Sequence, residues 1–97
     1  MLKEAETLQK SLLQAQSDLE NIEVKGVSGN GLVEVLMNAK GKLKNIKIKK
    51  EAVDPNDIET LEDLVLSAFH DAANRAESVS REKIAKLTGD KSFPKLF

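Results

Sequence analysis

The sequence predicts an α+β fold: a long N-terminal helix, a three-stranded antiparallel meander and a long C-terminal helix. Three observations support this prediction. Apolar residues over 1–22 follow heptad spacing, strand-like alternation surrounds Gly29-Asn30-Gly31, and a helical pattern runs from Asp57 to Thr88. Both helices are too long to fold back over so small a sheet. We therefore expect a dimer with protruding helical arms.

Length and composition indicate one small domain without covalent cross-links. The 97 residues include three Phe, no Trp, no Tyr and no Cys, so the core must rely on aliphatic side chains and disulfides are excluded. We expect a single domain over residues 1–90 and a flexible tail over residues 91–97. Because no apolar run approaches membrane-spanning length, we expect a soluble cytoplasmic protein with no membrane partner.

The first predicted helix has the narrow apolar seam of a coiled coil. No Gly or Pro interrupts residues 1–22, which would extend about 33 Å as a helix. The regular seam favours pairing with another helix along its length, and the alternative is an ordinary amphipathic helix that packs on a core. The seam residues, three or four positions apart, are Ala5, Leu8, Leu12, Ala15, Leu19 and Ile22.

Three strands are predicted between the helices. Gly and Asn tolerate positive φ, so Gly29-Asn30-Gly31 can reverse the chain tightly after the first strand. The third strand breaks strict alternation, and a β-bulge near Lys44-Asn45 would bring its apolar residues onto one face. The second strand is apolar on both faces, since Leu36 opposes Val33 and Val35, so both faces need cover. The expected strands are 22–27, 32–38 and 43–49.

The second predicted helix runs from Asp57 to Thr88, and Asp57 or Asn56, both of which follow Pro55, is a good N-cap. It would span about 48 Å, whereas a compact domain of this size has a radius of gyration of about 13 Å. Its C-terminal half must therefore project. The residues expected to pack its first half against the sheet are Leu61, Val65, Ala68 and Phe69.

The chain lacks the residue sets that catalysis requires. His70 is the only His and there is no Cys, so neither a His cluster for a metal ion nor a thiol nucleophile can form. The neighbouring carboxylates Glu62 and Asp63 suit the start of a solvated helix. The glycines do not have the spacing of a nucleotide-binding loop. We expect no enzyme activity, no metal, no cofactor and no small-molecule substrate.

Charge is strongly segregated along the chain although the net charge is only −1. Residues 40–50 hold six lysines and no acid, and residues 51–71 hold seven acids and no base. The lysines of the third strand have two interpretations: they form the solvated face of a sheet, where Lys also deters edge-to-edge aggregation, or a basic patch for phosphates. Residues 75–95 carry a net charge of +3, and much of this segment lies where the second helix projects with little to pack against.

Four segments, taken in order, resemble the YbaB/EbfC family of bacterial nucleoid-associated proteins. They are LQKSLLQAQSDLENIEV, GVSGNGLVEV, LKNIKIKKEAVDP and DIETLEDLVLSAFHDA. The resemblance runs from about Leu8 to Thr88, and the final FPKLF is similar to the family's Phe-ending C-terminus. The chain differs in two respects, because it lacks the usual Gly/Met-rich leader and its C-terminal tail is short.

This resemblance implies a homodimer of α-β-β-β-α chain order, whose helices protrude like tweezers and bind double-stranded DNA in the nucleoid. The family's modest or variable sequence preference, and the absence of base-reading motifs and stacking aromatics here, imply binding mainly through backbone phosphates, in nucleoid organisation or gene regulation. By analogy of position on the arms, and not by a recognised motif, the implied DNA contacts are Lys3, Lys10, Arg75, Arg81, Lys83 and Lys86.

A function of a different class is also compatible with the sequence: a dimeric adaptor or scaffold that binds another protein through its helical seam. The acidic blocks in residues 1–34 and 51–71 favour it, because they would repel DNA. A steep fall with salt in the affinity for unrelated duplexes would favour DNA binding instead.

Overall fold

The structure, a computed structural model, describes residues 2–88, with side chains from Thr7 to Lys86. Three strands lie between two helices, which confirms the predicted element order. The predicted tail over residues 91–97 lies outside the described residues. The elements are α1 (Leu2–Asn21), β1 (Glu23–Ser28), η1 (Gly29–Gly31), β2 (Val33–Asn38), β3 (Leu43–Ile48), η2 (Lys50–Ala52) and α2 (Ile58–Thr88).

The strands form one antiparallel sheet in the order β1-β2-β3. The predicted turn at Gly29-Asn30-Gly31 is confirmed, with positive φ at all three residues. The predicted β-bulge is also confirmed, because Lys44 has no partner on β2. The bulge restores the alternation of β3, so its three apolar side chains share a face with three of β2. The pairs on this face are Val33–Ile48, Val35–Ile46 and Met37–Leu43.

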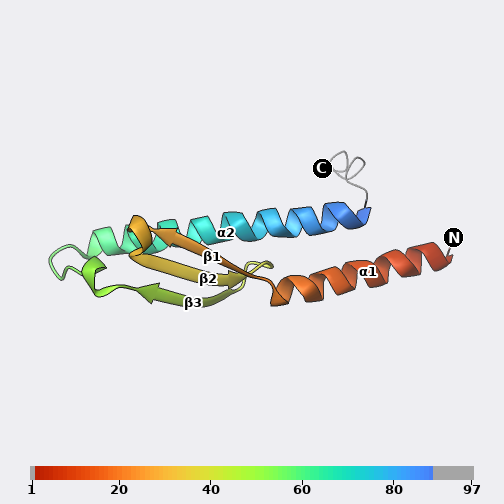
Figure 1. Cartoon of the computed structure of the whole chain (residues 1–97), viewed down its shortest axis with the longest axis horizontal. Helices are drawn as coiled ribbons and strands as arrows, with labels where there is room; N and C mark the ends of the chain where they lie inside the picture. Colours follow the sequence, from red (N-terminus) through yellow and green to blue (C-terminus); the bar gives the residue numbers. More distant parts are fainter. Residues whose placement is uncertain (1, 89–97) are drawn as a thin grey trace.

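The core lies between α2 and one face of β1 and β2 (Figure 1). Asp57, one of the two predicted N-caps, caps the start of α2: its carboxylate accepts a hydrogen bond from the Thr60 N–H at 3.2 Å. The buried positions of α2 are alanines one turn apart, so the helix packs close to the strands. The core cluster of buried residues is Val33, Val35, Met37, Ala68, Ala72 and Ala76.

Gly26 of β1 sets the separation between the sheet and α2. A Cβ atom at this position would lie 2.2 Å from the carbonyl oxygen of Ala68 and 2.3 Å from the backbone nitrogen of Ala72. Both of these neighbours are helix backbone atoms, which cannot rotate away as a side chain can. Glycine is therefore required for the close approach of helix and strand.

Helix α2 also overhangs the outer edge of β1. The Asp71 carboxylate accepts a hydrogen bond from the Val27 N–H at 3.0 Å and lies 3.3 Å from Arg75 Nε. The hydrogen bond from Val27 is the largest cause that lowers the pKa of Asp71. Desolvation raises this pKa, and the charge of Arg75 lowers it further. The Ser28 hydroxyl donates to the Leu64 carbonyl at 2.6 Å. Two long-range hydrogen bonds thus tie β1 to α2.

Asp71→Asn is expected to make stability less dependent on pH. Because the pKa of Asp71 is lowered in the folded chain, its ionised form stabilises the fold above the ordinary carboxyl pKa, and this contribution is lost as pH falls through the folded-state pKa. Asparagine keeps an acceptor oxygen for Val27 but carries no charge. The melting temperature, followed by circular dichroism from about pH 6 to about pH 2, should fall more for the wild type than for the variant. Parallel curves would contradict this role of Asp71.

Helices α1 and α2 extend beyond the sheet in the same direction and run antiparallel to each other (Figure 1). The chain measures 64 × 25 × 16 Å. Its radius of gyration is 17.8 Å, against about 13 Å for a compact domain of this length, so the predicted projection of α2 is confirmed. The inner part of α1 is buried at Ala15 and Leu19, whereas Leu8 and Leu13 are 44% and 59% exposed.

One predicted core residue lies at the surface. Phe69 is 37% exposed, so the prediction that it packs in the core is wrong for the single chain. Leu64 and Asp71 bond to β1 from one flank of α2. At about 100° per residue, Phe69 projects from the opposite flank, on the side of β3. Helix α2 packs on β1 and β2 and does not cover β3.

The apolar side of β3 is therefore open in the described part of the chain. Its three apolar side chains are each at least 40% exposed, beside the uncovered flank of α2. Together they define the apolar strip: Leu43, Ile46, Ile48, Ile58, Leu66 and Phe69. The opposite face of β2, which the sequence also predicts to need cover, is half-buried at Leu36.

Candidate nucleic-acid interface

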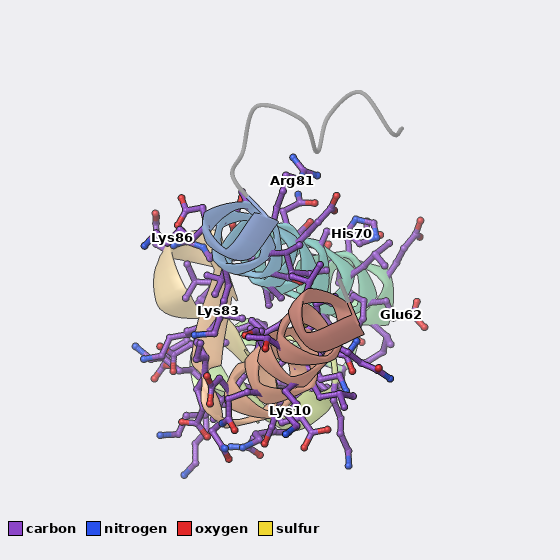
Figure 2. The ribbon with its side chains drawn as sticks, turned by 90° about the vertical axis from the view of Figure 1, so that its right-hand side faces the viewer. Lys10, Glu62, His70, Arg81, Lys83 and Lys86 are labelled. Carbon is purple, nitrogen blue, oxygen red and sulfur yellow. The ribbon has the colours of Figure 1, made fainter. Side chains whose placement is uncertain are left out.

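The basic residues of the arms do not gather on one face. Figure 2 views the molecule along the two helices. Lys83 points into the space between α2 and α1, whereas Arg81 points away from α1. Lys10 lies on the side of α1 that is turned away from α2. Lys86 points in a direction that differs from those of Arg81, Lys83 and Lys10. The arms thus present positive charge on several sides.

Three arm cations are paired with acids of the same chain. The pairs are Arg75–Asp71 (3.3 Å), Arg81–Glu77 and Lys83–Asp18 (3.4 Å). Exposed ion pairs of this kind contribute little to stability, so a phosphate group can replace the carboxylate at small cost. Lys10 and Lys86 have no ion-pair partner among the side chains described, and Lys3 precedes the first described side chain.

Lys83 and Lys86 border a hollow between the two arms. Gln14 Nε2 donates to Asp18 Oδ1 at 3.0 Å. This bond lowers the pKa of Asp18 most, desolvation opposes it, and Lys83 lowers it further, so the carboxylate is ionised at neutral pH. Two cations therefore face one anion, beside groups that can donate to phosphate oxygens. We call this site the arm hollow: Ser11, Gln14, Ala15, Asp18, Lys83 and Lys86.

The polar residues of α1 in the arm hollow are not among the residues predicted from the sequence. Ser11, Gln14 and Asp18 are three or four positions apart, which places them on one side of the helix. That spacing is visible in the sequence. It does not show that these residues face Lys83, however, because this depends on how α1 packs against α2.

The lysines of residues 40–50 are partly balanced by acids from neighbouring elements. The ion pairs are Lys40–Glu20 and Lys44–Glu23, both at 3.2 Å. Lys42, Lys47, Lys49 and Lys50 have no ion-pair partner among the described side chains. The structure thus agrees with a solvated, charge-balanced surface for part of this block, while four of its six lysines form no ion pair with the described side chains.

The described part of the chain offers no candidate metal site. No three His, Cys, Asp or Glu side chains in this part of the chain are grouped to hold a metal ion. His70 is exposed on α2, with its ring 6.4 Å from that of Phe69. None of the described helices is long and apolar enough to span a membrane. Open charged arms and an open apolar strip define a binding protein of the α+β class.

Comparison with known proteins shows to which family this binding protein belongs. A model described as the YbaB/EbfC DNA-binding family matches residues 1–91, and the chain belongs to this family. A protein of Rhodospirillum centenum named as nucleoid-associated is 46% identical over 94 residues, which cover 97% of this chain and 88% of that protein. A protein of Clostridium kluyveri, also named as nucleoid-associated, is 41% identical over 97 residues, which cover all of this chain and 85% of that protein.

A solved structure shares the fold. The crystal structure of an uncharacterized protein from Helicobacter pylori superposes with a TM-score of 0.72 and covers 84% of each chain, at 23% identity. The family match confirms the resemblance found in the sequence. The family is a DNA-binding one and not an enzyme family, in agreement with the absence of catalytic residue sets from the sequence.

Proposed function

We propose that this chain is a homodimeric nucleoid-associated protein that binds double-stranded DNA, mainly through backbone phosphates and with weak sequence preference, in nucleoid organisation or gene regulation. The observation that carries the proposal is the match to a DNA-binding family over residues 1–91. Relatives that are 46% and 41% identical are named nucleoid-associated proteins, which supports a location in the nucleoid.

The arms supply the DNA contacts in this proposal. They project from the sheet, away from the acidic first half of α2. In the arm hollow, two ammonium groups, a hydroxyl and an amide can all donate to phosphate oxygens. Cations on the other sides of the arms would contact neighbouring phosphates as the duplex passes. The proposed contacts are Lys3, Lys10, Arg75, Arg81, Lys83 and Lys86.

Backbone recognition follows from the side chains that the arms carry. Phe69 is the one Phe that the structure describes, and it lies beside the sheet and not on the arms. Stacking on bases, which single-stranded recognition uses, therefore has no platform on the described arms. Lysine and arginine contacts to phosphates carry no direct sequence information, so the sequence preference should be weak.

The apolar strip supports the homodimer. Its six side chains are between 37% and 55% exposed, three of them on β3 and three on α2. A contiguous apolar patch of this kind on a soluble protein marks an interaction site. A second copy of the chain presents the same strip, so a two-fold axis through it would cover both copies at once.

A salt titration with unrelated duplexes tests the DNA-binding proposal. We expect affinity to fall steeply with salt, because each neutralised phosphate adds about 0.9 to the slope of log affinity against log salt. Asp18→Asn should tighten binding about two- to fivefold, since it removes the acid that competes with phosphate for Lys83. Glu82→Gln is the matched control, because it removes an exposed acid of α2 outside the arm hollow.

The outcomes distinguish a failure of the arm hollow as the contact site from a failure of DNA binding itself. A smaller gain for Glu82→Gln than for Asp18→Asn supports the arm hollow as the contact site. Equal gains would mean that only the overall charge matters and that the hollow is not the site. If the wild type does not bind duplex DNA at low salt, the DNA-binding proposal itself fails.

The second candidate is the protein-binding adaptor. Leu8 of the predicted seam favours it, because this side chain is 44% exposed on α1. An apolar seam on a projecting helix can pair with a helix of another protein. Absence of DNA binding, together with a stable homodimer, would favour this function.

A further inference from the structure

The sheet face opposite α2 carries a row of lysines, which we call the lysine face: Lys25, Lys42, Lys44, Lys47 and Lys49. On β1 and β2, side chains of this face alternate with those that pack under α2. Lys25, Lys44 and Lys47 are exposed, and so is the intervening Val27. Helix α1 meets the sheet near the end of β2, where the Ala39 N–H donates to the Leu19 carbonyl at 3.1 Å.

The acids on this face are too few to balance its lysines. Glu23 lies 3.2 Å from Lys44, and Glu34 lies 3.6 Å from Lys25. Glu34 is also the cross-strand neighbour of Lys47. Five lysines against two glutamates leave a net charge of +3 on one side of a small sheet.

The opposite side of the molecule has the opposite charge. The first half of α2 carries acids and no base before Arg75. A polyanion would therefore be attracted to the lysine face and repelled from the α2 side, so the field of the domain sets the direction of approach. The acids in question are Glu59, Glu62, Asp63 and Asp71.

The row of cations matches the geometry of a nucleic-acid backbone. Lys49 has an extended backbone, with φ of −78° and ψ of 149°, so it continues the alternation of β3 and shares a face with Lys47. Two such residues lie about 6.6 Å apart, and the row from Lys42 to Lys49 extends about 20 Å. One DNA strand places a phosphate every 3.4 Å or so along the axis, so the row spans about six phosphates of one strand.

We propose that the lysine face is a second phosphate-binding surface, which holds a second segment of double-stranded DNA while the arms hold the first. This inference rests on the proposed function of the arms. The two surfaces are separate, because the arms project beyond the end of the sheet in a molecule 64 Å long. The described lysine face has no aromatic side chain, so the duplex backbone fits it better than unstacked bases do. One dimer thus links two DNA segments.

A bridging assay tests this inference on the full-length protein. A duplex is fixed on beads, protein is added, and retention of a second, fluorescent duplex is measured beside the affinity for a single duplex. The test variant combines Lys42→Gln, Lys47→Gln and Lys49→Gln, which removes the three lysines of the lysine face that have no ion-pair partner among the described side chains. Arginine at the same three positions is the matched control. The arm variant combines Lys10→Gln and Lys86→Gln.

We expect the glutamine variant at the sheet to lose bridging by about tenfold or more. It should keep single-duplex binding through the arms. The arginine control should bridge normally. Bridging that survives in the glutamine variant overturns the inference, since the arms of two protomers would then suffice. If the sheet variant loses all DNA binding and the arm variant loses none, the lysine face is the sole DNA surface and the two-surface inference fails. If the wild type binds no duplex, the proposed function fails first.

Discussion

Gly26→Val is expected to destabilise the domain more than any other single substitution considered. The new side chain would have to fit where even a Cβ atom lies 2.2 Å from the Ala68 carbonyl oxygen. Helix α2 would have to move away from the sheet and expose the buried side of β2. Overpacking of this kind costs about 3 kcal/mol or more, which corresponds to a fall of about 12–24 °C in melting temperature for a domain of this size.

Gly41→Ala is the control for this prediction. Gly41 has a φ of +91° and no neighbouring atom within 4 Å of a built Cβ, so alanine there introduces backbone strain without a clash. Its cost should be about 1–3 kcal/mol, clearly smaller than that of Gly26→Val. Thermal unfolding monitored by circular dichroism compares the two variants. Similar losses for both would contradict the close approach of α2 as the reason for the glycine at position 26.

Ile46→Lys is expected to convert the proposed homodimer into a folded monomer. Ile46 is 40% exposed in the single chain, so a lysine there can extend its ammonium group into water without disturbing the core. In a dimer that covers the apolar strip, the same charge would be buried without a partner, which costs several kcal/mol. Sedimentation velocity at micromolar concentration measures the mass, and circular dichroism confirms that the chain is folded.

Val27→Lys is the matched control for the dimer interface. Val27 is also 40% exposed and also lies on a strand, but its side chain is on the lysine face. This variant should remain dimeric. If both variants remain dimeric, the apolar strip is not the interface. If Val27→Lys alone dissociates, the dimer forms through the opposite face of the sheet.

Local chemistry was sufficient to predict the elements of this fold. The turn at Gly29-Asn30-Gly31, the bulge at Lys44 and the cap at Asp57 each depend on a few neighbouring residues, and all three are found where the sequence places them. The projection of α2 followed from its length alone. In each case the physical cause is contained in a short stretch of chain.

Features that depend on the packing of distant segments could not be predicted in the same way. Phe69 continues the apolar pattern of α2, yet it is exposed because α2 lies over β1 and β2 and leaves β3 open. The need for glycine at position 26 depends on where Ala68 and Ala72 pass. The pairing of Lys83 with Asp18 likewise requires the docking of α1 on α2.

The overhang of α2 on β1 has a consequence for how large an assembly can become. On this border of the sheet, the Val27 N–H is occupied by Asp71 and the Ser28 hydroxyl by Leu64, so a strand from another molecule meets a helix there. At the β3 border, no helix covers the strand in the described chain. A sheet that is closed on one side and open on the other can accept one neighbour, and a like neighbour uses up its own open side in the process. In the proposed homodimer, growth through the strands would therefore stop at two chains.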